Sequence, residues 1–174
     1  TSTRLVTRGR AEWTYGHFEI RAKLPCAIGT WPAIWMLGKN IIEPGAYWSN
    51  SFGNTSWPAC GELDIMEYAG NVPLRTTSAA HYANSGGAHE YKSGAIINNT
   101  ELSEEYHTYG MLWLPNEITF VFDGRPVMIL KKSDTGLSRW PFGPNAQGVN
   151  PKMYLIFNLA MGGNYGGAID SGLK

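Results

Sequence analysis

The sequence predicts an all-β protein in which two antiparallel sheets pack against each other as a sandwich. Short alternations of apolar and polar residues recur along the chain, and turns rich in Gly and Pro separate them, with 21 Gly and 10 Pro in total. No segment of 11 or more residues has a helical period. Many short strands joined by tight turns are typical of such folds. Because the chain has 174 residues and no internal repeat, we expect a single domain over residues 1–174.

The clearest alternation covers residues 17–24, where one face carries only apolar side chains and Pro25 ends the strand. Residues 31–37 follow as a strand in which Trp31 and Trp35 share a face. Further strands are predicted at residues 4–8, 74–82, 106–113, 118–122, 126–130 and 153–160.

Asp123-Gly124 separates two of these strands and is a strong hairpin signal. Residues 39–58 are predicted to be a loop beside the functional site, because long loops in compact domains are often functional. We also predict loops at 84–100, around one weak strand, and at 132–150, with a helical turn near Leu137.

The composition favours a neutral ligand. The formal net charge is zero and only 16% of the residues are charged, which argues against nucleic acid or an anionic membrane as the partner. There is no run of 18 apolar residues, so no membrane span is predicted. Seven Trp and nine Tyr fit a β-rich core and also aromatic platforms on which sugar rings can stack.

Residues 57–68 (WPACGELDIMEY) contain three carboxylates within six positions. In a regular strand Glu62 and Asp64 point to one side and the apolar residues between them to the other. Glu67 would then point into the core. A one-residue bulge at Ile65-Met66 lets two residues oppose one and returns Glu67 to the face of the other acids.

Three carboxylates on one surface repel one another, so at least one should keep its proton at neutral pH. A strand that only solvates a face usually mixes Lys, Thr and Glu, which makes that alternative a poor fit. Cleavage of a glycosidic bond requires one ionised carboxyl group as nucleophile and one protonated carboxyl group as acid, side by side. The pattern therefore predicts a glycosidase.

The stretch Glu62-Leu63-Asp64-Ile65-Met66-Glu67 resembles the active-site strand of glycoside hydrolase family 16. Its extra apolar residue before the last Glu is similar to laminarinases, the endo-β-1,3-glucanases, and also to agarases and carrageenases. Other stretches that resemble the family lie at residues 13–19, 29–38, 113–118, 121–124 and 157–164. The resemblance implies a β-jelly roll whose concave sheet holds the substrate cleft.

By this resemblance Glu62 is the nucleophile, Glu67 is the general acid and then base, and Asp64 lies between them and steadies the nucleophile. The substrate-binding residues implied are Trp31, Trp57, His81 and Trp113; for Trp113 the pattern leaves burial in the core equally open. Trp35 is expected in the core. Tyr165 stands where laminarinases commonly have Trp, which would weaken one sugar contact.

The implied function is endo-acting hydrolysis of β-1,3-glucosidic bonds in laminarin-type glucans, with retention of configuration. Two alternatives stay open: a hydrolase of mixed-linkage β-glucan or galactan, and a non-catalytic β-glucan-binding protein. No cofactor is required; the family's structural calcium cannot be assigned to residues here. Secretion is expected because such glucans lie outside cells. Members of the family have further strands before Thr1 and after Lys174, so we expect either that this chain is a fragment or that another chain covers its exposed sheet edges.

Overall fold

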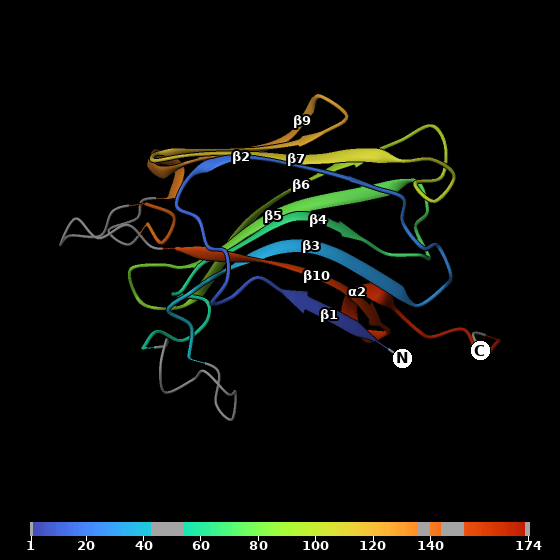
Figure 1. Ribbon diagram of the computed structural model, residues 1–174, viewed down its shortest axis with the longest axis horizontal. Helices are drawn as coiled ribbons and strands as arrows, with labels where there is room; N and C mark the ends of the chain where they lie inside the picture. Colours follow the sequence, from blue (N-terminus) through green and yellow to red (C-terminus); the bar gives the residue numbers. More distant parts are fainter. Residues whose placement is uncertain (1, 43–53, 136–139, 144–151, 173–174) are drawn as a thin grey trace.

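The computed structural model describes residues 2–42, 54–135, 140–143 and 152–172, and these form two antiparallel sheets that face each other (Figure 1). This confirms the predicted fold class. The larger sheet has the order β1 (Thr3–Val6), β10 (Met153–Met161), β3 (Thr30–Gly38), β4 (Glu62–Tyr68), β5 (Arg75–Ala83), β6 (His89–Ile97). The smaller sheet has the order β2 (Gly16–Ala22), β7 (His107–Leu114), β8 (Glu117–Phe122), β9 (Arg125–Lys131).

Helical structure in the described residues is limited to the 3-10 turn η1 (Lys132–Thr135) and the short α2 (Gly163–Gly166). Neither these nor any other described segment is a helix of the length and apolarity that crossing a bilayer requires. The helical turn predicted near Leu137 lies outside the described residues, as does most of the predicted loop at 39–58. The loop predicted at 84–100 is wrong in one respect, because nine of its residues form the full strand β6.

The hairpin predicted at Asp123-Gly124 is confirmed: β8 and β9 are joined there, with φ angles of 45° and 74° at the two turn residues. Positive φ at both positions is what a tight two-residue hairpin needs. The Asp123 carboxylate also accepts a hydrogen bond from the Thr108 amide and contacts His107 Nδ1, each at 2.7 Å. The turn is therefore tied to the adjacent strand β7.

The core lies between the two sheets and is built from the inward faces of β3, β4, β5, β7, β8 and β9. Trp113 belongs to it: the side chain has no exposed surface, and its indole N–H donates to the Phe142 carbonyl at 2.7 Å. The prediction that Trp113 binds substrate is wrong. The reason is that β7 is in the smaller sheet, so the face that Trp113 shares with Met111 is covered by the larger sheet.

The predicted bulge in β4 is confirmed. Asp64 pairs with Ala79 and Glu67 pairs with Thr77 on β5, so two residues of β4 oppose the single Ser78. Those two, Ile65 and Met66, are each only 1% exposed. Because both extra side chains enter the core, the residue after them returns to the outer face of the sheet.

Candidate active site

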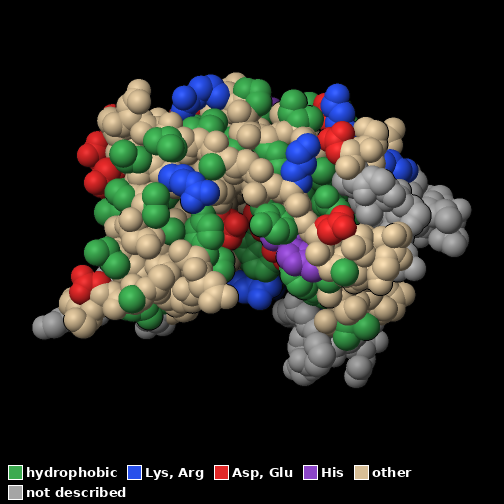
Figure 2. Space-filling model, turned by 180° about the vertical axis from the view of Figure 1, so that it is seen from behind, with side chains coloured by type: hydrophobic (Ala, Val, Ile, Leu, Met, Phe, Trp, Pro, Cys, Tyr) green, Lys and Arg blue, Asp and Glu red, His purple; other side chains and the backbone are tan. Residues whose placement is uncertain are grey.

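A cleft opens on the outer face of the larger sheet. In Figure 2 this side of the molecule is hollowed, with acidic side chains deep in the hollow and histidine beside it. β1, β3, β4 and β10 all contribute to the lining. The lining residues are Ser2, Thr3, Arg4, Trp31, Ala33, Trp35, Glu62, Asp64, Glu67, Asn158, Leu159 and Ala160.

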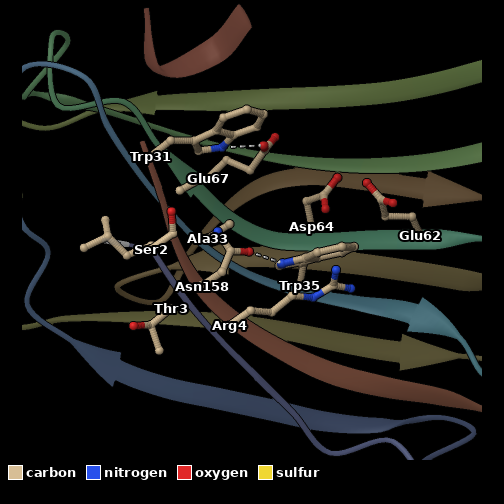
Figure 3. Close-up of a pocket in the computed structure, with 12 residues that line it drawn as sticks. Ser2, Thr3, Arg4, Trp31, Ala33, Trp35, Glu62, Asp64, Glu67 and Asn158 are labelled. Carbon is tan, nitrogen blue, oxygen red and sulfur yellow. Dashed lines mark hydrogen bonds between the residues drawn. The ribbon is translucent and has the colours of Figure 1, made fainter. Parts of the chain in front are cut away.

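All three predicted acids line this cleft and lie along β4 (Figure 3). Asp64 is the deepest of them, with only 4% of its surface exposed, whereas Glu62 and Glu67 are half-buried. The bulge thus brings together carboxyl groups that a regular strand would have separated onto two faces.

An exposed tryptophan stands at the Glu62 end of the cluster. The Trp57 indole N–H donates to Glu62 Oε2 at 3.0 Å, and the Trp57 side chain is 43% exposed on the segment that leads into β4. Its partly exposed ring lies beside a carboxyl group of the cleft. This is the arrangement that a bound sugar ring would need for stacking.

At the Glu67 end the donor comes from a neighbouring strand of the sheet. The Trp31 indole N–H donates to Glu67 Oε1 at 3.0 Å from within β3 (Figure 3). Tyr165 packs on Trp31, with ring centroids 5.3 Å apart. The Tyr165 hydroxyl lies 2.7 Å from Thr77 Oγ1 on β5. Trp31 and Trp57 therefore occupy matching positions at opposite ends of the acid strand.

His81 reaches the centre of the cluster from β5: its Nε2 lies 3.1 Å from Asp64 Oδ2. On its other side, His81 Nδ1 lies 2.9 Å from His89 Nε2, and the two rings stack at 5.1 Å. His89 in turn packs on Trp57 at 4.6 Å. Sequence reasoning missed His89 because it placed residues 84–100 in a loop; a hairpin between β5 and β6 would have brought the two histidines together.

Trp35 lines the cleft, so its predicted place in the core is wrong. It is half-buried, its indole N–H donates to Asn158 Oδ1 at 2.6 Å, and the Arg4 guanidinium lies 5.1 Å from its ring centroid. The alternation on β3 explains this: Ile34 and Met36 point inward, and every second residue from Trp31 points to the cleft. Arg4 and Asn158 carried no sequence signal.

Comparison with known proteins identifies the family to which this chain belongs. The model of the family "Glycosyl hydrolases family 16" matches residues 1–150. The chain belongs to that family. A curated "Beta-glucanase" of Rhodothermus marinus is 37% identical over 172 residues, which is 96% of this chain but 54% of the relative.

Two solved family 16 structures have the same architecture. LamA from Z. galactanivorans, in complex with laminaritriose and laminaritetraose, has a TM-score of 0.82 at 35% identity, covering 97% of this chain and 63% of its own. The laminarinase from Rhodothermus marinus has a TM-score of 0.75 at 34% identity, covering 96% and 63%. The chain therefore spans between half and two thirds of the length of these relatives. Other curated relatives are named as a keratan-sulfate endo-1,4-β-galactosidase and a β-1,3-glucan-binding protein.

Burial raises the pKa of all three carboxyl groups in this family 16 cleft. The pKa of Glu62 rises to about 8, first through burial and then through the charge of Asp64, while His81 and the Trp57 hydrogen bond oppose the rise. Burial and the nearby Glu67 raise the pKa of Asp64 well above its usual range. Burial also raises the pKa of Glu67, against the Trp31 hydrogen bond. The cluster therefore keeps at least one proton at neutral pH, shared among coupled carboxyl groups.

Among the described residues, one group has donor atoms close enough together to share a metal ion: Glu62, Asp64 and His81, within 4.8 Å of one another. Two of these atoms already contact each other, and Glu62 accepts a hydrogen bond from Trp57. A histidine is also unlike the oxygen ligands that Ca²⁺ takes. We therefore assign no metal to this family 16 cleft, and structural calcium stays a prediction without ligands.

Proposed function

We propose that this family 16 domain cleaves β-1,3-glucosidic bonds inside laminarin-type glucans, with retention of anomeric configuration. The observation that carries the proposal is the cluster of three carboxyl groups on the open face of one strand. An indole N–H donates to each of its two outer members, Glu62 and Glu67.

In the first step Glu67 donates its proton to the glycosidic oxygen while a Glu62 oxygen attacks the anomeric carbon. The bond between that carbon and the leaving oxygen breaks, and a covalent glycosyl ester forms on Glu62. In the second step Glu67, now ionised, takes a proton from water, the water oxygen attacks the anomeric carbon, and the ester bond breaks. Each step inverts the centre, so the product keeps the configuration of the substrate.

Asp64 lies deepest in the cleft, between the two glutamates, and influences the charge of Glu62. When it holds a proton, its O–H can donate to the Glu62 carboxylate, and its own charge no longer raises the pKa of the nucleophile. His81 Nε2 lies 3.1 Å from Asp64 Oδ2, within reach for a hydrogen bond to the ionised carboxylate. A protonated Asp64 thus allows the neighbouring Glu62 to be ionised and to act as the nucleophile.

The aromatic lining supports a sugar polymer as substrate. Trp57 stands exposed beside Glu62, and Trp31 and Trp35 line the cleft floor. Pyranose rings offer apolar C–H faces that stack on such side chains. Arg4 is the one Lys or Arg among the described lining residues, which favours a neutral glucan over a densely sulfated polymer.

Two other functions fit the family. One is hydrolysis of mixed-linkage β-glucan or galactan, since one relative is named an endo-1,3-1,4-β-glycanase and another a keratan-sulfate endo-1,4-β-galactosidase. The other is glucan binding without catalysis, as the name of the Penaeus monodon relative states for that protein. The presence of all three acids in the cleft, with an indole N–H donating to each of the two glutamates, favours an enzyme over a binding protein.

The decisive experiment is a panel of laminarin, lichenan, agarose and keratan sulfate, assayed for new reducing ends, with Glu62→Gln as the inactive control. We expect the highest kcat/KM on laminarin and a β-anomer as the first product by NMR. Activity confined to lichenan or a galactan would replace the substrate assignment. A first product with the α configuration would overturn the double displacement, and binding without any cleavage would favour the glucan-binding alternative.

Secretion and cover for the sheet edges are further proposals. The substrate proposed here lies outside cells, which supports secretion. β2 is an edge strand of the smaller sheet, and its inward side chains Phe18, Ile20 and Ala22 are only partly buried. An added strand from this protein or from a partner would complete their burial. Light scattering of the full-length protein would separate the two sources, because only a partner chain raises the mass.

A further inference from the structure

A glycine-rich turn lies directly on Trp31, the residue that donates to Glu67. This turn contains α2 and follows β10. A Cβ atom at Gly163 would lie 3.3 Å from the Trp31 ring, and one at Gly166 would lie 3.2 Å from Trp31 Cβ. Gly163 also has a φ of +79°, which side chains other than glycine adopt with strain. The two glycines let the backbone approach the indole closely from one side.

Tyr165 is the one residue of α2 with a large side chain, and it links this turn to the opposite side of the acid strand. Its ring packs on Trp31 at a centroid distance of 5.3 Å and an interplanar angle of 30°. Its hydroxyl lies 2.7 Å from Thr77 Oγ1. Thr77 is the cross-strand partner of Glu67 in the ladder between β4 and β5. The four residues thus form a closed ring of contacts around the Glu67 carboxyl group.

We propose that Tyr165 is a positioning residue that holds the Trp31 indole on Glu67, and so controls the protonation of the group we assign as general acid and base. The catalytic part of this inference rests on the function proposed above. The positioning part does not, because the contact between Trp31 and Glu67 exists without substrate.

The Tyr165 hydroxyl fixes the orientation of the ring; we call this contact with Thr77, together with the packing on Trp31, the brace. Without it the ring would pack on Trp31 through dispersion alone, which is not directional. With it, Tyr165 is fixed at both ends, by Thr77 on β5 and by the backbone of α2. The weaker sugar contact expected from a Tyr at this position is therefore accompanied by a contact that supports the acid.

The direction of the effect follows from the surroundings of Glu67. Glu62 and Asp64 face it from β4 and disfavour its charge, whereas His81 from β5 favours it. Tyr165 faces it from α2, with Arg75 of β5 nearby. The Trp31 N–H is the hydrogen bond that stabilises the ionised carboxylate. Loosening Trp31 weakens that bond, so the pKa of Glu67 rises.

The test compares Tyr165→Phe, Thr77→Val and the double variant with wild type, and uses Tyr106→Phe as the matched control. Tyr106 is 56% exposed and packs against Arg21, away from the cleft. The first readout is the pH titration of the Trp31 indole ¹H–¹⁵N signal, assigned with Trp31→Phe, in the absence of substrate. The second is the alkaline limb of the kcat/KM profile on laminarin.

We expect both single variants to raise the titration midpoint of the Trp31 signal by about 0.5 pH unit, as loss of roughly 0.7 kcal/mol of hydrogen bonding would do. The double variant should match either single one, since one contact is removed in each case. The alkaline limb should move by the same amount, with KM changed less than about twofold, while Tyr106→Phe changes neither.

A Trp31 signal that titrates as in wild type in both single variants would overturn the proposal. A rise in KM without any shift of the alkaline limb would show that Tyr165 contacts sugar instead. If the indole titration shifts as expected but no glucan is cleaved, the brace stands and the proposed function fails. Thr77→Val keeps the test decisive if Tyr165→Phe does not fold.

Discussion

The two glutamates at the ends of the acid strand accept the same kind of hydrogen bond from very different supports. Trp57, which donates to Glu62, is 43% exposed and lies outside the regular strands. Trp31, which donates to Glu67, is half-buried within β3 and packed against Tyr165. Both indoles pack on an aromatic neighbour, Trp57 on His89 at 4.6 Å and Trp31 on Tyr165 at 5.3 Å, so the difference between them is one of exposure. We infer from it that Trp57 is available to a ligand and that Trp31 positions Glu67.

The two ends also differ in how the strand presents them. Glu62 points to the cleft through the ordinary alternation of β4, and so does Asp64. Glu67 points there only because of the bulge at Ile65 and Met66. The geometry of Glu62 is thus a local property of the strand, and that of Glu67 depends on how β4 pairs with both neighbours.

The largest effects should come from removing either carboxyl group. Glu62→Ala should lower kcat on laminarin by about 10⁴-fold or more, because no covalent ester can form. Glu67→Ala should lower it by about 10²- to 10⁴-fold. With an activated aryl laminaribioside and azide, the first variant should yield an α-glycosyl azide and the second a β-glycosyl azide, identified by NMR.

The control for this pair is Glu104→Ala, an exposed carboxylate outside the cleft, which should behave as wild type. If the two variants gave the azide products in the opposite order, the roles of Glu62 and Glu67 would have to be exchanged.

Deleting Met66 tests the dependence of Glu67 on the bulge. Without the extra residue Glu67 stands four positions after Glu62, so the alternation of a regular strand keeps it on the cleft face. The rate on laminarin should therefore fall by less than in Glu67→Ala, because the general acid still faces the substrate. A loss in the folded deletion variant as large as in Glu67→Ala would show that the bulge itself is needed to place Glu67.

Replacing each tryptophan by phenylalanine should separate binding from positioning. Trp57→Phe should raise KM by roughly 10-fold, since stacking surface is lost, and should also move the acidic limb of kcat/KM upward, because Glu62 loses its donor. Trp31→Phe should leave KM within about threefold and move the alkaline limb of kcat/KM upward, because Glu67 loses its donor. Steady-state kinetics across pH 4 to 10 measure both; identical profiles for the two variants would contradict the proposed division of roles.

The smallest effect concerns stability. Burial, followed by the charge of Asp64, raises the pKa of Glu62 to about 8, so between about pH 4.5 and 8 the folded state binds more protons than the unfolded state. The free energy of unfolding should therefore fall as pH rises through this window. Asp64→Asn removes one carboxyl group of the cluster and should reduce that fall by on the order of 2 kcal/mol. The effect is no larger because the carboxyl groups face the cleft and are partly hydrated.

Urea denaturation at pH 5 and pH 8 measures this difference. Glu105→Gln replaces an exposed carboxylate and serves as the control, with the pH dependence of wild type. A difference between the two pH values that is the same in wild type and Asp64→Asn would mean that the acid cluster does not set the pH dependence of folding.

The two misplaced tryptophans show where sequence reasoning stopped. Trp113 and Trp35 both lie in strands of clear alternation, and in both cases the set of residues on the same face was predicted correctly. The choice of the core was wrong for Trp35, and for Trp113 the alternation had left core and cleft equally open. Alternation divides a strand into two faces, but it does not indicate which face another sheet will cover. The position of Trp35 could have been inferred, because Trp31 on the same face had already been placed in the cleft.

Residues 57–68 by themselves determined that three acids share a surface, and that an extra apolar residue must bulge for the third to join them. This holds because the direction of side chains along a strand is a local property. Only the tertiary structure decided that His89 meets His81, that Tyr165 reaches Thr77, and that Trp113 is enclosed. These contacts join segments that are apart in the sequence, and their existence depends on which strands pair and which sheet covers which face.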